Sequence, residues 1–375
     1  MLSNMINVLY ISHESRDVLG STLSLANMLN SVKEEVKPTV VLPRNGKAYD
    51  YLKGQGFSCI IVPFKLNISP IKFGILKYVP RKIVNYCVNS MGIKRLCKIV
   101  EEEDIQLVHS NSGVVTIGYM LAKRCGLKHV WHLREFQDLD FGFTPFTGWK
   151  KLLAMIHDSD AVIAITNAVA EHFGISRRPG CHVVYNAVGK SEDICFAAKK
   201  SETILFCGHV IPNKGAEKAL DIFTGFHKEH PRYKLYYLGA VDDGYKSHLK
   251  QKAGENGIAD AVEFLGYRND VKTYVKKASA LLMCSENEAL GRVTVEAMFY
   301  GCPILGYSSG GTKELISDGY NGFLFSSIDE AIAKLSMVVS NDNKKIIDNA
   351  HDFVKNNFTE EVYGEKILSI YKSLL

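Results

Sequence analysis

The sequence predicts an α/β protein made of two doubly wound parallel-sheet domains, and three observations predict this fold class. Short runs rich in Val, Ile and Leu alternate with longer amphipathic stretches along the whole chain, which is typical of strands that helices cover on both faces. The chain holds 13 such runs, more than one open sheet usually carries. Its 375 residues also suit two or three domains of ordinary size.

The first half supplies seven of the predicted strands, at residues 6–12, 39–43, 59–63, 107–111, 129–133, 161–166 and 182–186. Helix patterns fall between them at 22–32, 93–103 and 114–125. The second half supplies six strands, at residues 204–207, 235–239, 262–265, 280–284, 303–307 and 322–325. Its helix patterns lie at 214–230, 293–300, 329–339 and 344–355.

A polar stretch at residues 188–202 separates the two halves. We therefore expect a first domain over residues 1–190 and a second over residues 191–358, followed by a terminal helix at 359–375. Thr359 stands where it can cap that helix, and its apolar stripe consists of Val362, Ile367, Leu368 and Tyr371. Such a stripe could pack on either domain.

The composition, with 46% hydrophobic and 23% charged residues, excludes a disordered or collagen-like chain. The nine cysteines are odd in number and never spaced Cys-x-x-Cys, so we interpret them as reduced thiols and not as disulfides or zinc ligands. Residues 1–20 lack a basic region before their apolar run and are interpreted as a first strand, not a signal peptide. No stretch reaches the roughly 18 apolar residues of a membrane span. We expect a cytoplasmic protein, with a peripheral position at the inner face of the membrane left open.

The charge is unevenly distributed. Residues 1–190 carry 23 Lys and Arg against 15 Asp and Glu, whereas residues 191–375 carry 22 against 25. Positions 51–100 hold nine basic residues and no acidic one: Lys53, Lys65, Lys72, Lys77, Arg81, Lys82, Lys94, Arg95 and Lys98. Such a stretch suits an anionic partner, for which a phospholipid surface or a lipid diphosphate is favoured over nucleic acid, and a neutral solvated face stays an alternative.

The most informative segment is residues 280–307, which predicts a strand, a loop, a helix and a second strand. Glu288 falls on the loop and Glu296 in the second turn of the helix, an arrangement that lets two carboxylates serve one ligand. Between them, Leu290, Gly291 and Arg292 bring backbone N–H groups to a helix N-terminus, where a diphosphate binds readily. Both glutamates could instead be solvated surface charges.

Two further strand-to-helix loops carry polar residues. Gly208 and His209 lead to Lys214, whose cation at a helix start opposes the helix dipole and therefore suits an anionic ligand. Residues 308–314 contain a glycine pair that could hold ligand hydroxyls or form a tight turn. In the first half, His109 and His132 each lie at the end of a predicted strand, where either a cleft residue or a buried core histidine would stand.

These segments together resemble the retaining family 4 glycosyltransferases of the GT-B fold, also described as glycosyl transferases group 1. The resemblance rests on Glu288-x7-Glu296 followed by Ala-Met, on the turn Gly208-x5-Lys214-Gly215, and on Gly310-Gly311-x-x-Glu314. It extends over the first half through residues 104–109, 131–135, 160–166 and 184–186, in the expected order. The resemblance implies two Rossmann-like domains facing an interdomain cleft.

The resemblance further implies that the second domain binds a nucleotide sugar and the first domain an acceptor. Glu288 and His132 would be the catalytic residues, with Glu288 steadying the charge that develops on the transferred sugar. Donor binding would fall to Gly208, His209, Lys214, Leu290, Gly291, Arg292 and Glu296. Acceptor binding would fall to Gly20, His109 and Arg134.

Two departures from the family pattern matter. The family usually has Arg where this chain has His209, and His carries a full charge only when it is protonated. The usual glycine pair of the first strand–helix loop is reduced to Gly20-Ser21. The pairs Asp138-x-Asp140 and Asp158-x-Asp160 only superficially resemble a metal site, so we expect no metal cofactor, with Lys214 and helix amides stabilising the leaving diphosphate.

The predicted function is transfer of a hexose from a nucleoside diphosphate sugar, such as a UDP- or GDP-sugar, to a glycan or lipid-linked acceptor. It would proceed with retention and serve polysaccharide or glycolipid biosynthesis at the cell surface, with no nucleic-acid partner. Two alternatives stay open: a nucleotide-sugar epimerase of the same architecture, and a non-catalytic nucleotide-sugar-binding subunit. Neither the base, the sugar, the acceptor nor the linkage follows from the sequence.

Overall fold

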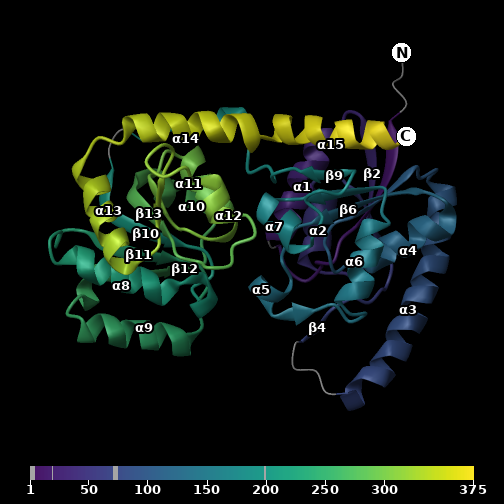
Figure 1. Cartoon of the computed structure of the whole chain (residues 1–375), viewed down its shortest axis with the longest axis horizontal. Helices are drawn as coiled ribbons and strands as arrows, with labels where there is room; N and C mark the ends of the chain where they lie inside the picture. The colour runs from purple at the N-terminus through teal and green to yellow at the C-terminus, as the bar shows by residue number, and fades with distance from the viewer. Residues whose placement is uncertain (1–4, 19, 71–74, 198–199) are drawn as a thin grey trace. The chain divides into compact units, whose positions relative to one another are not determined.

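The computed structural model describes residues 5–18, 20–70, 75–197 and 200–375. The chain divides into two compact units, of which the first comprises Met1–Ala187 and Glu360–Leu375 and the second Val188–Thr359. Each unit is built around one parallel sheet with helices on its faces (Figure 1). The predicted fold class, two doubly wound α/β domains, is confirmed.

The first unit holds a sheet of seven parallel strands. Their spatial order is β3 (Ser58–Ile61), β2 (Val36–Leu42), β1 (Ile6–Ile11), β5 (Leu107–Ser110), β6 (Lys128–Leu133), β8 (Ala161–Ala164) and β9 (Cys181–Val183). A small antiparallel pair, β4 (Ser69–Pro70) with β7 (Phe143–Thr144), was not expected from the sequence.

Alternation along the strands builds one core on each face of this sheet. In β1, Val8 and Tyr10 belong to a core shared with α1 (Gly20–Val32), α2 (Lys47–Gly54) and α15 (Glu360–Leu374). Leu9 and Ile11 belong to the opposite core, shared with α3 (Ile75–Glu102) and α4 (Thr116–Cys125). The shorter helices of this unit are α5 (Asp138–Phe141), α6 (Trp149–His157) and α7 (Asn167–His172).

Two helices of the first unit add to what the sequence predicts. The apolar stripe of α15 packs into the first unit through Tyr363, Ile367 and Tyr371, which settles the choice that the sequence left open. Helix α3 begins at Ile75 and not near residue 93, and it continues through Pro80. Among the side chains described before residue 93, Lys82, Ile83, Val84 and Tyr86 are exposed, so the apolar pattern there does not predict a helix with one buried face.

The second unit holds six parallel strands in the order β12 (Val262–Gly266), β11 (Lys234–Leu238), β10 (Ser201–Cys207), β13 (Ala278–Met283), β14 (Ile304–Tyr307) and β15 (Phe323–Phe325). One face forms a core with α8 (Ala216–His227), α9 (Asp243–Glu255) and α13 (Ile328–Ser340). Helices α10 (Val271–Lys277) and α11 (Arg292–Phe299) pack against the sheet as well, and α14 (Lys344–Asn357) packs on α11. The short α12 (Gly310–Leu315) follows β14.

Both sheets reverse their strand order beside their first strand. The reversal falls between β1 and β5 in the first unit and between β10 and β13 in the second. Loops that leave the carboxyl ends of two such strands run to opposite faces and open a crevice between them, where ligands of doubly wound sheets bind. The fold therefore directs attention to these two sheet edges.

Candidate functional site

Three loops of the second unit meet at the carboxyl edge of its sheet. They follow β10, β13 and β14, which are neighbours in the sheet and surround the point where its strand order reverses. These loops contain the three segments that the sequence analysis selected. The topology therefore brings together residues that are separated by up to about 100 positions in the chain.

Lys214 and Glu288 form an ion pair at this edge. Lys214 ends a short 3₁₀ turn, Pro212–Lys214, before α8, and Glu288 lies on the loop after β13. The Lys214 Nζ and Glu288 Oε2 atoms lie 2.7 Å apart. The two side chains keep 36% and 16% of their surface exposed, so the pair is accessible to a ligand. A lysine held at this edge supplies a point charge for a phosphate oxygen.

Two glycines allow these loops to approach one another. Gly215 has a φ of 72°, and a Cβ there would lie 2.3 Å from the backbone carbonyl oxygen of Cys284. A Cβ at Gly311 would lie 2.6 Å from the carbonyl oxygen of Ala289, and the Gly311 N–H donates a 2.7 Å hydrogen bond to the Glu288 carbonyl. Any larger residue at either position would push the loops apart.

Helix α11 carries the second glutamate. Glu296 lies in its second turn and accepts a 2.8 Å hydrogen bond from Arg292 Nε. Gly291 precedes the helix with a φ of 79°, and no side chain of the described residues caps the N-terminus of the helix. Three buried side-chain atoms around this end have no hydrogen-bond partner among the described residues: Arg292 Nη1, Thr294 Oγ1 and Thr312 Oγ1. Unsatisfied buried polar atoms are costly unless a ligand or water completes them.

The remaining donor-site residues of the sequence analysis lie on the same loops. Gly208, with a φ of 124°, and the exposed His209 follow β10, and Leu290 is buried on the loop after β13. The structure thus places the predicted donor residues at one sheet edge, although Glu296 pairs with Arg292 and not with Lys214.

His109 and His132 are buried within the first unit. His109 Nε2 lies 3.2 Å from His132 Nδ1, and Tyr371 Oη lies 2.8 Å from His109 Nδ1. Burial, and then the nearby Arg134 cation, hold the pKa of both imidazoles well below its ordinary value, so both rings are neutral near pH 7. His132 Nε2 is buried with no hydrogen-bond partner among the described residues, which leaves that atom for a ligand.

Arg134 is a buried cation surrounded by neutral groups. Its guanidinium donates to Asn111 Oδ1 at 2.7 Å and to Asn186 Oδ1 at 2.5 Å, and it lies 3.4 Å from Tyr363 Oη. Gly20, by contrast, is exposed at the start of α1, and a Cβ there would meet no atom within 4 Å. The fold itself therefore does not require glycine at position 20.

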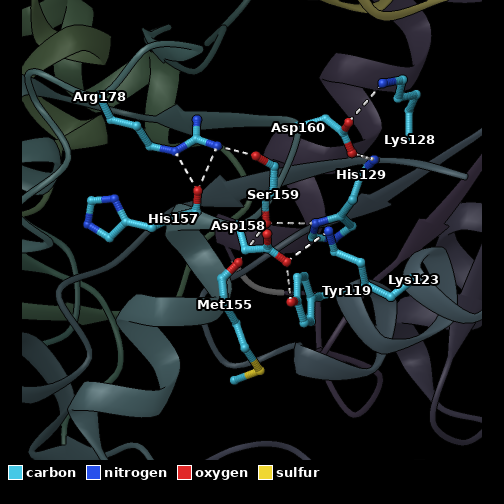
Figure 2. Close-up of polar contacts among 10 residues, drawn as sticks. All are labelled: Tyr119, Lys123, Lys128, His129, Met155, His157, Asp158, Ser159, Asp160 and Arg178. Atoms are coloured by element: carbon cyan, nitrogen blue, oxygen red, sulfur yellow. Dashed lines mark hydrogen bonds and ion pairs between the residues drawn. The ribbon is translucent and has the colours of Figure 1, made fainter.

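The aspartates of both pairs that resemble a metal site form other contacts. Asp138 Oδ1 lies 2.9 Å from His172 Nε2, and Asp140 accepts a 2.9 Å hydrogen bond from the Phe136 N–H. Figure 2 shows Asp158 paired with Lys123 and Tyr119, and Asp160 with Lys128 and the His129 backbone N–H, at distances of 2.6–3.0 Å. Both aspartates precede β8 and so lie at the amino edge of the sheet, opposite the ligand edge. Within the described part of the chain, no three His, Cys, Asp or Glu side chains are grouped so as to hold a metal ion.

Sequence reasoning missed four buried polar residues of the first unit: Asn111, Ser112, Glu135 and Gln137. They directly follow β5 and β6, so their place just beyond two apolar strands is the signal that could have found them. Ser112 Oγ and the Gly113 N–H both donate to Glu135 Oε1. Burial nevertheless raises the pKa of the Glu135 carboxyl to about 7.

Two expectations about the whole chain can be compared with the structure. All nine cysteines are free thiols. Within the described residues, no helix is long and apolar enough to cross a membrane. Of the basic residues at positions 51–100, Lys72 and the side chain of Lys77 lie outside the described part of the structure.

Comparisons with known proteins converge on one family. Residues 191–359 match the family model Glycosyl transferases group 1. An uncharacterized glycosyltransferase of Haemophilus influenzae is 31% identical over 183 residues, which cover 48% of this chain and 50% of the relative. The Campylobacter jejuni enzyme GalNAc-alpha-(1->4)-GalNAc-alpha-(1->3)-diNAcBac-PP-undecaprenol alpha-1,4-N-acetyl-D-galactosaminyltransferase is 32% identical over 168 residues, 43% of this chain and 46% of that enzyme. These alignments span about half the length of the two relatives.

The crystal structure of Anabaena HepE in complex with UDP resembles the whole chain. Its TM-score is 0.82 at 19% sequence identity, and the alignment covers 98% of this chain and all of that one. At this identity the likeness shows the fold alone, which is the two-domain GT-B fold that the sequence predicts.

Proposed function

We propose that the chain is a retaining glycosyltransferase of the glycosyl transferases group 1 family, whose model matches residues 191–359. It transfers a hexose-type sugar from a nucleoside diphosphate donor to a glycan or lipid-linked acceptor. The observation that carries the proposal is the Lys214–Glu288 pair, set among unsatisfied polar atoms at the edge where the strand order of the second sheet reverses.

The donor's diphosphate would take Lys214 as its cation. The N-terminus of α11 would add the positive end of its helix dipole at the same edge and help to stabilise the leaving phosphate without a metal cofactor. Glu296 would bind the ribose hydroxyls. Glu288, once Lys214 turns to the phosphate, would face the hydroxyls of the transferred sugar and steady its positive charge.

Retention of configuration would not need a nucleophile from the protein. The departing phosphate oxygen accepts the proton of the acceptor hydroxyl, whose oxygen bonds to the sugar on the face that the phosphate leaves. His132, neutral and with Nε2 unpartnered, is suited to hydrogen bond a sugar hydroxyl and not to carry charge. The UDP bound by the structural neighbour and the lipid-linked substrate in the Campylobacter relative's name support a UDP-sugar and a membrane-borne acceptor.

The first experiment is a panel of nucleotide sugars tested for thermal stabilisation of the protein and for slow donor hydrolysis. One UDP- or GDP-sugar should raise the melting temperature and be hydrolysed, and Glu288→Ala should abolish most of the turnover. Full activity in Glu288→Ala would remove the role given to Glu288. A new sugar isomer formed from donor alone would favour an epimerase, and binding without any turnover would favour a non-catalytic subunit.

We further propose that the protein works at the inner, anionic face of the membrane. Between residues 81 and 100, helix α3 exposes Lys82, Lys94, Arg95 and Lys98 and no carboxylate. The same stretch exposes apolar side chains, Ile83 at 60%, Val84 at 50%, Tyr86 at 75% and Met91 at 64%. Cations beside exposed apolar groups on one helix match the headgroups and acyl boundary of an anionic bilayer.

Sedimentation with vesicles of phosphatidylglycerol and phosphatidylcholine tests this placement. Reversing Lys82, Lys94 and Arg95 to Glu should release the protein from the vesicles. The matched control reverses Lys228, Lys250 and Lys344, three exposed lysines of the second unit, and should keep binding. Equal binding by both triple variants would count against α3 as the membrane surface.

A further inference from the structure

Two cysteine thiols lie in contact between two helices of the first unit. Cys97 is on α3 and Cys125 is the last residue of α4. The Cys125 thiol donates a hydrogen bond to the Cys97 sulfur over 3.2 Å, although the two residues are 28 positions apart in the sequence. A disulfide bond is about 2.05 Å long, so an approach of about 1 Å would join the two sulfurs.

The packing around the two thiols keeps their sulfurs close together. Both side chains are half-buried and pack against the core that α3 and α4 share with the first sheet, which includes Leu96, Leu121 and Ala122. Because packed cores deform little, the two helices keep the sulfurs within reach of one another while the first unit is folded. Partial burial still leaves room for a small reagent to reach the pair.

The charges and hydrogen bonding near the pair give the two thiols different roles. Six basic residues and no acidic one lie within three positions of the two cysteines: Lys94, Arg95, Lys98, Lys123, Arg124 and Lys128. Positive charge assists the attack of a cysteine sulfur on an oxidant. Burial, and then the hydrogen bond to Cys97, raise the pKa of Cys125 to about 11, and the charges acting on Cys125 are those of Arg124 and Glu101. Cys125 therefore keeps its proton and donates it toward Cys97, which is the sulfur that reacts first.

We infer that Cys97 and Cys125 form a redox modification site, at which hydrogen peroxide converts the two thiols to a disulfide between α3 and α4. The Cys97 sulfur attacks one oxygen of the peroxide, the O–O bond breaks, and Cys97 becomes a sulfenic acid with release of one water. The Cys125 sulfur then attacks the Cys97 sulfur, the S–OH bond breaks, and the hydroxyl leaves as water with the Cys125 proton. The two thiols lose two electrons in total, which reduce the peroxide to two waters, and an added dithiol reverses the reaction.

The disulfide would fasten α3 to α4 away from the ligand edge of the first sheet. The strands that follow these helices are β5 and β6, so the ends of α3 and α4 lie toward the amino edge of the sheet. Ligands of doubly wound sheets bind at the opposite edge, and the inference is therefore independent of the proposed function. A bond that closes a loop of 28 positions restricts the unfolded chain and should raise the unfolding temperature by at least about 4 °C.

The test treats the native full-length protein with a small molar excess of hydrogen peroxide, blocks the remaining thiols with N-ethylmaleimide and maps the tryptic peptides by mass spectrometry. Trypsin cuts beside both cysteines, so the disulfide should appear as residues 96–98 joined to residues 125–128. Dithiothreitol should separate the two peptides. The same treatment should raise the unfolding temperature, and dithiothreitol should return it to the value of the untreated protein.

Serine variants assign the reaction to the two thiols. Cys97→Ser and Cys125→Ser should each abolish the linked peptides and the rise in unfolding temperature, and in Cys125→Ser the sulfenic acid of Cys97 should be trapped by dimedone. The matched control Cys181→Ser removes another half-buried thiol and should keep both effects. The peptide map of the wild type needs no variant. A native wild type that yields no linked peptides, links either cysteine to a different one, or gains the bond without a change in unfolding temperature would overturn the inference.

Discussion

The ion pair between Lys214 and Glu288 predicts that removing the glutamate charge tightens the binding of UDP. In the ligand-free protein Lys214 Nζ is 2.7 Å from Glu288 Oε2, so a diphosphate must compete with the carboxylate for the same ammonium group. Glu288→Gln removes this competition and also removes a negative charge that would repel the phosphates. The same substitution should slow sugar transfer, since Glu288 is proposed to stabilise the transferred sugar.

The size of the effect follows from the exposure of the pair. Fully exposed ion pairs contribute about 0.2–1 kcal/mol, and hydrogen bonds to charged groups about 1.5–3 kcal/mol. Side-chain exposures of 36% and 16% place this pair between the two cases, at about 1–2 kcal/mol. Since about 1.4 kcal/mol corresponds to a factor of ten, Glu288→Gln should bind UDP roughly 5- to 30-fold more tightly.

Isothermal titration calorimetry with UDP measures this directly. Lys214→Met should weaken UDP binding, the opposite of the effect expected for Glu288→Gln. The neighbouring pair of Lys218 and Glu286, 2.6 Å apart with Glu286 62% exposed, supplies the control, and Glu286→Gln should leave UDP affinity within about twofold of the wild type. If Glu288→Gln binds UDP no more tightly than the wild type, Lys214 is not the diphosphate ligand and the proposed donor site is wrong.

Three further predictions concern stability. Burial lowers the pKa of His129 from 6.5 to about 3, so below pH 6.5 the unfolded chain binds a proton that the folded protein excludes. The free energy of unfolding should therefore fall as the pH falls below 6.5, by about 3 kcal/mol at pH 4.5. In urea unfolding at pH 7 and pH 4.5, His129→Gln should lose less stability than the wild type. Gly215→Ala should destabilise the protein by about 2–4 kcal/mol through its clash with a backbone carbonyl, whereas Gly54→Ala, in open space on α2, should stabilise it slightly in the same urea assay. Tyr371→Phe should cost about 1–2 kcal/mol in thermal unfolding because it leaves a buried imidazole nitrogen unpaired, and the exposed Tyr320→Phe should cost nothing measurable.

The sequence predicts the elements of the fold where a helix or strand buries an apolar stripe. Both sheets and the strand-end position of Lys214 and Glu288 follow from such patterns, because parallel strands place their following loops at one edge. The turns of α3 before residue 93 could not be predicted in this way, since Lys82, Ile83, Val84 and Tyr86, among the side chains described there, are exposed. The docking of α15 was equally undetermined, because an apolar stripe fits any apolar face.

The buried polar residues that follow β5 and β6 could have been found from their place in the sequence, but their hydrogen-bond partners could not. Gln137 stands four residues after the end of β6, and no neighbouring residue in the sequence indicates its positive φ or its unpartnered amide. Both properties appear only when the chain is folded and the hydrogen bonds of each buried group are counted. Sequence patterns predict which side chains are buried. Whether a buried polar group has a hydrogen-bond partner depends on residues that are distant in the sequence and close in the fold.

The two sheet edges differ in the charged and polar groups that they place near a ligand. At the edge of the second sheet, the Lys214 cation, the start of α11 and Arg292 lie beside two carboxylates, Glu288 and Glu296, and the hydroxyls of Thr294 and Thr312, which are unpartnered among the described residues. At the edge of the first sheet, Gln137 Oε1 and the Glu135 carboxyl are acceptors, and Asn111 Nδ2 and Gln137 Nε2 are donors. A diphosphate reaches a cation more readily at the second edge, because the Lys214 side chain is 36% exposed and Arg134 is only 7% exposed. This difference supports the proposed binding of the donor by the second unit.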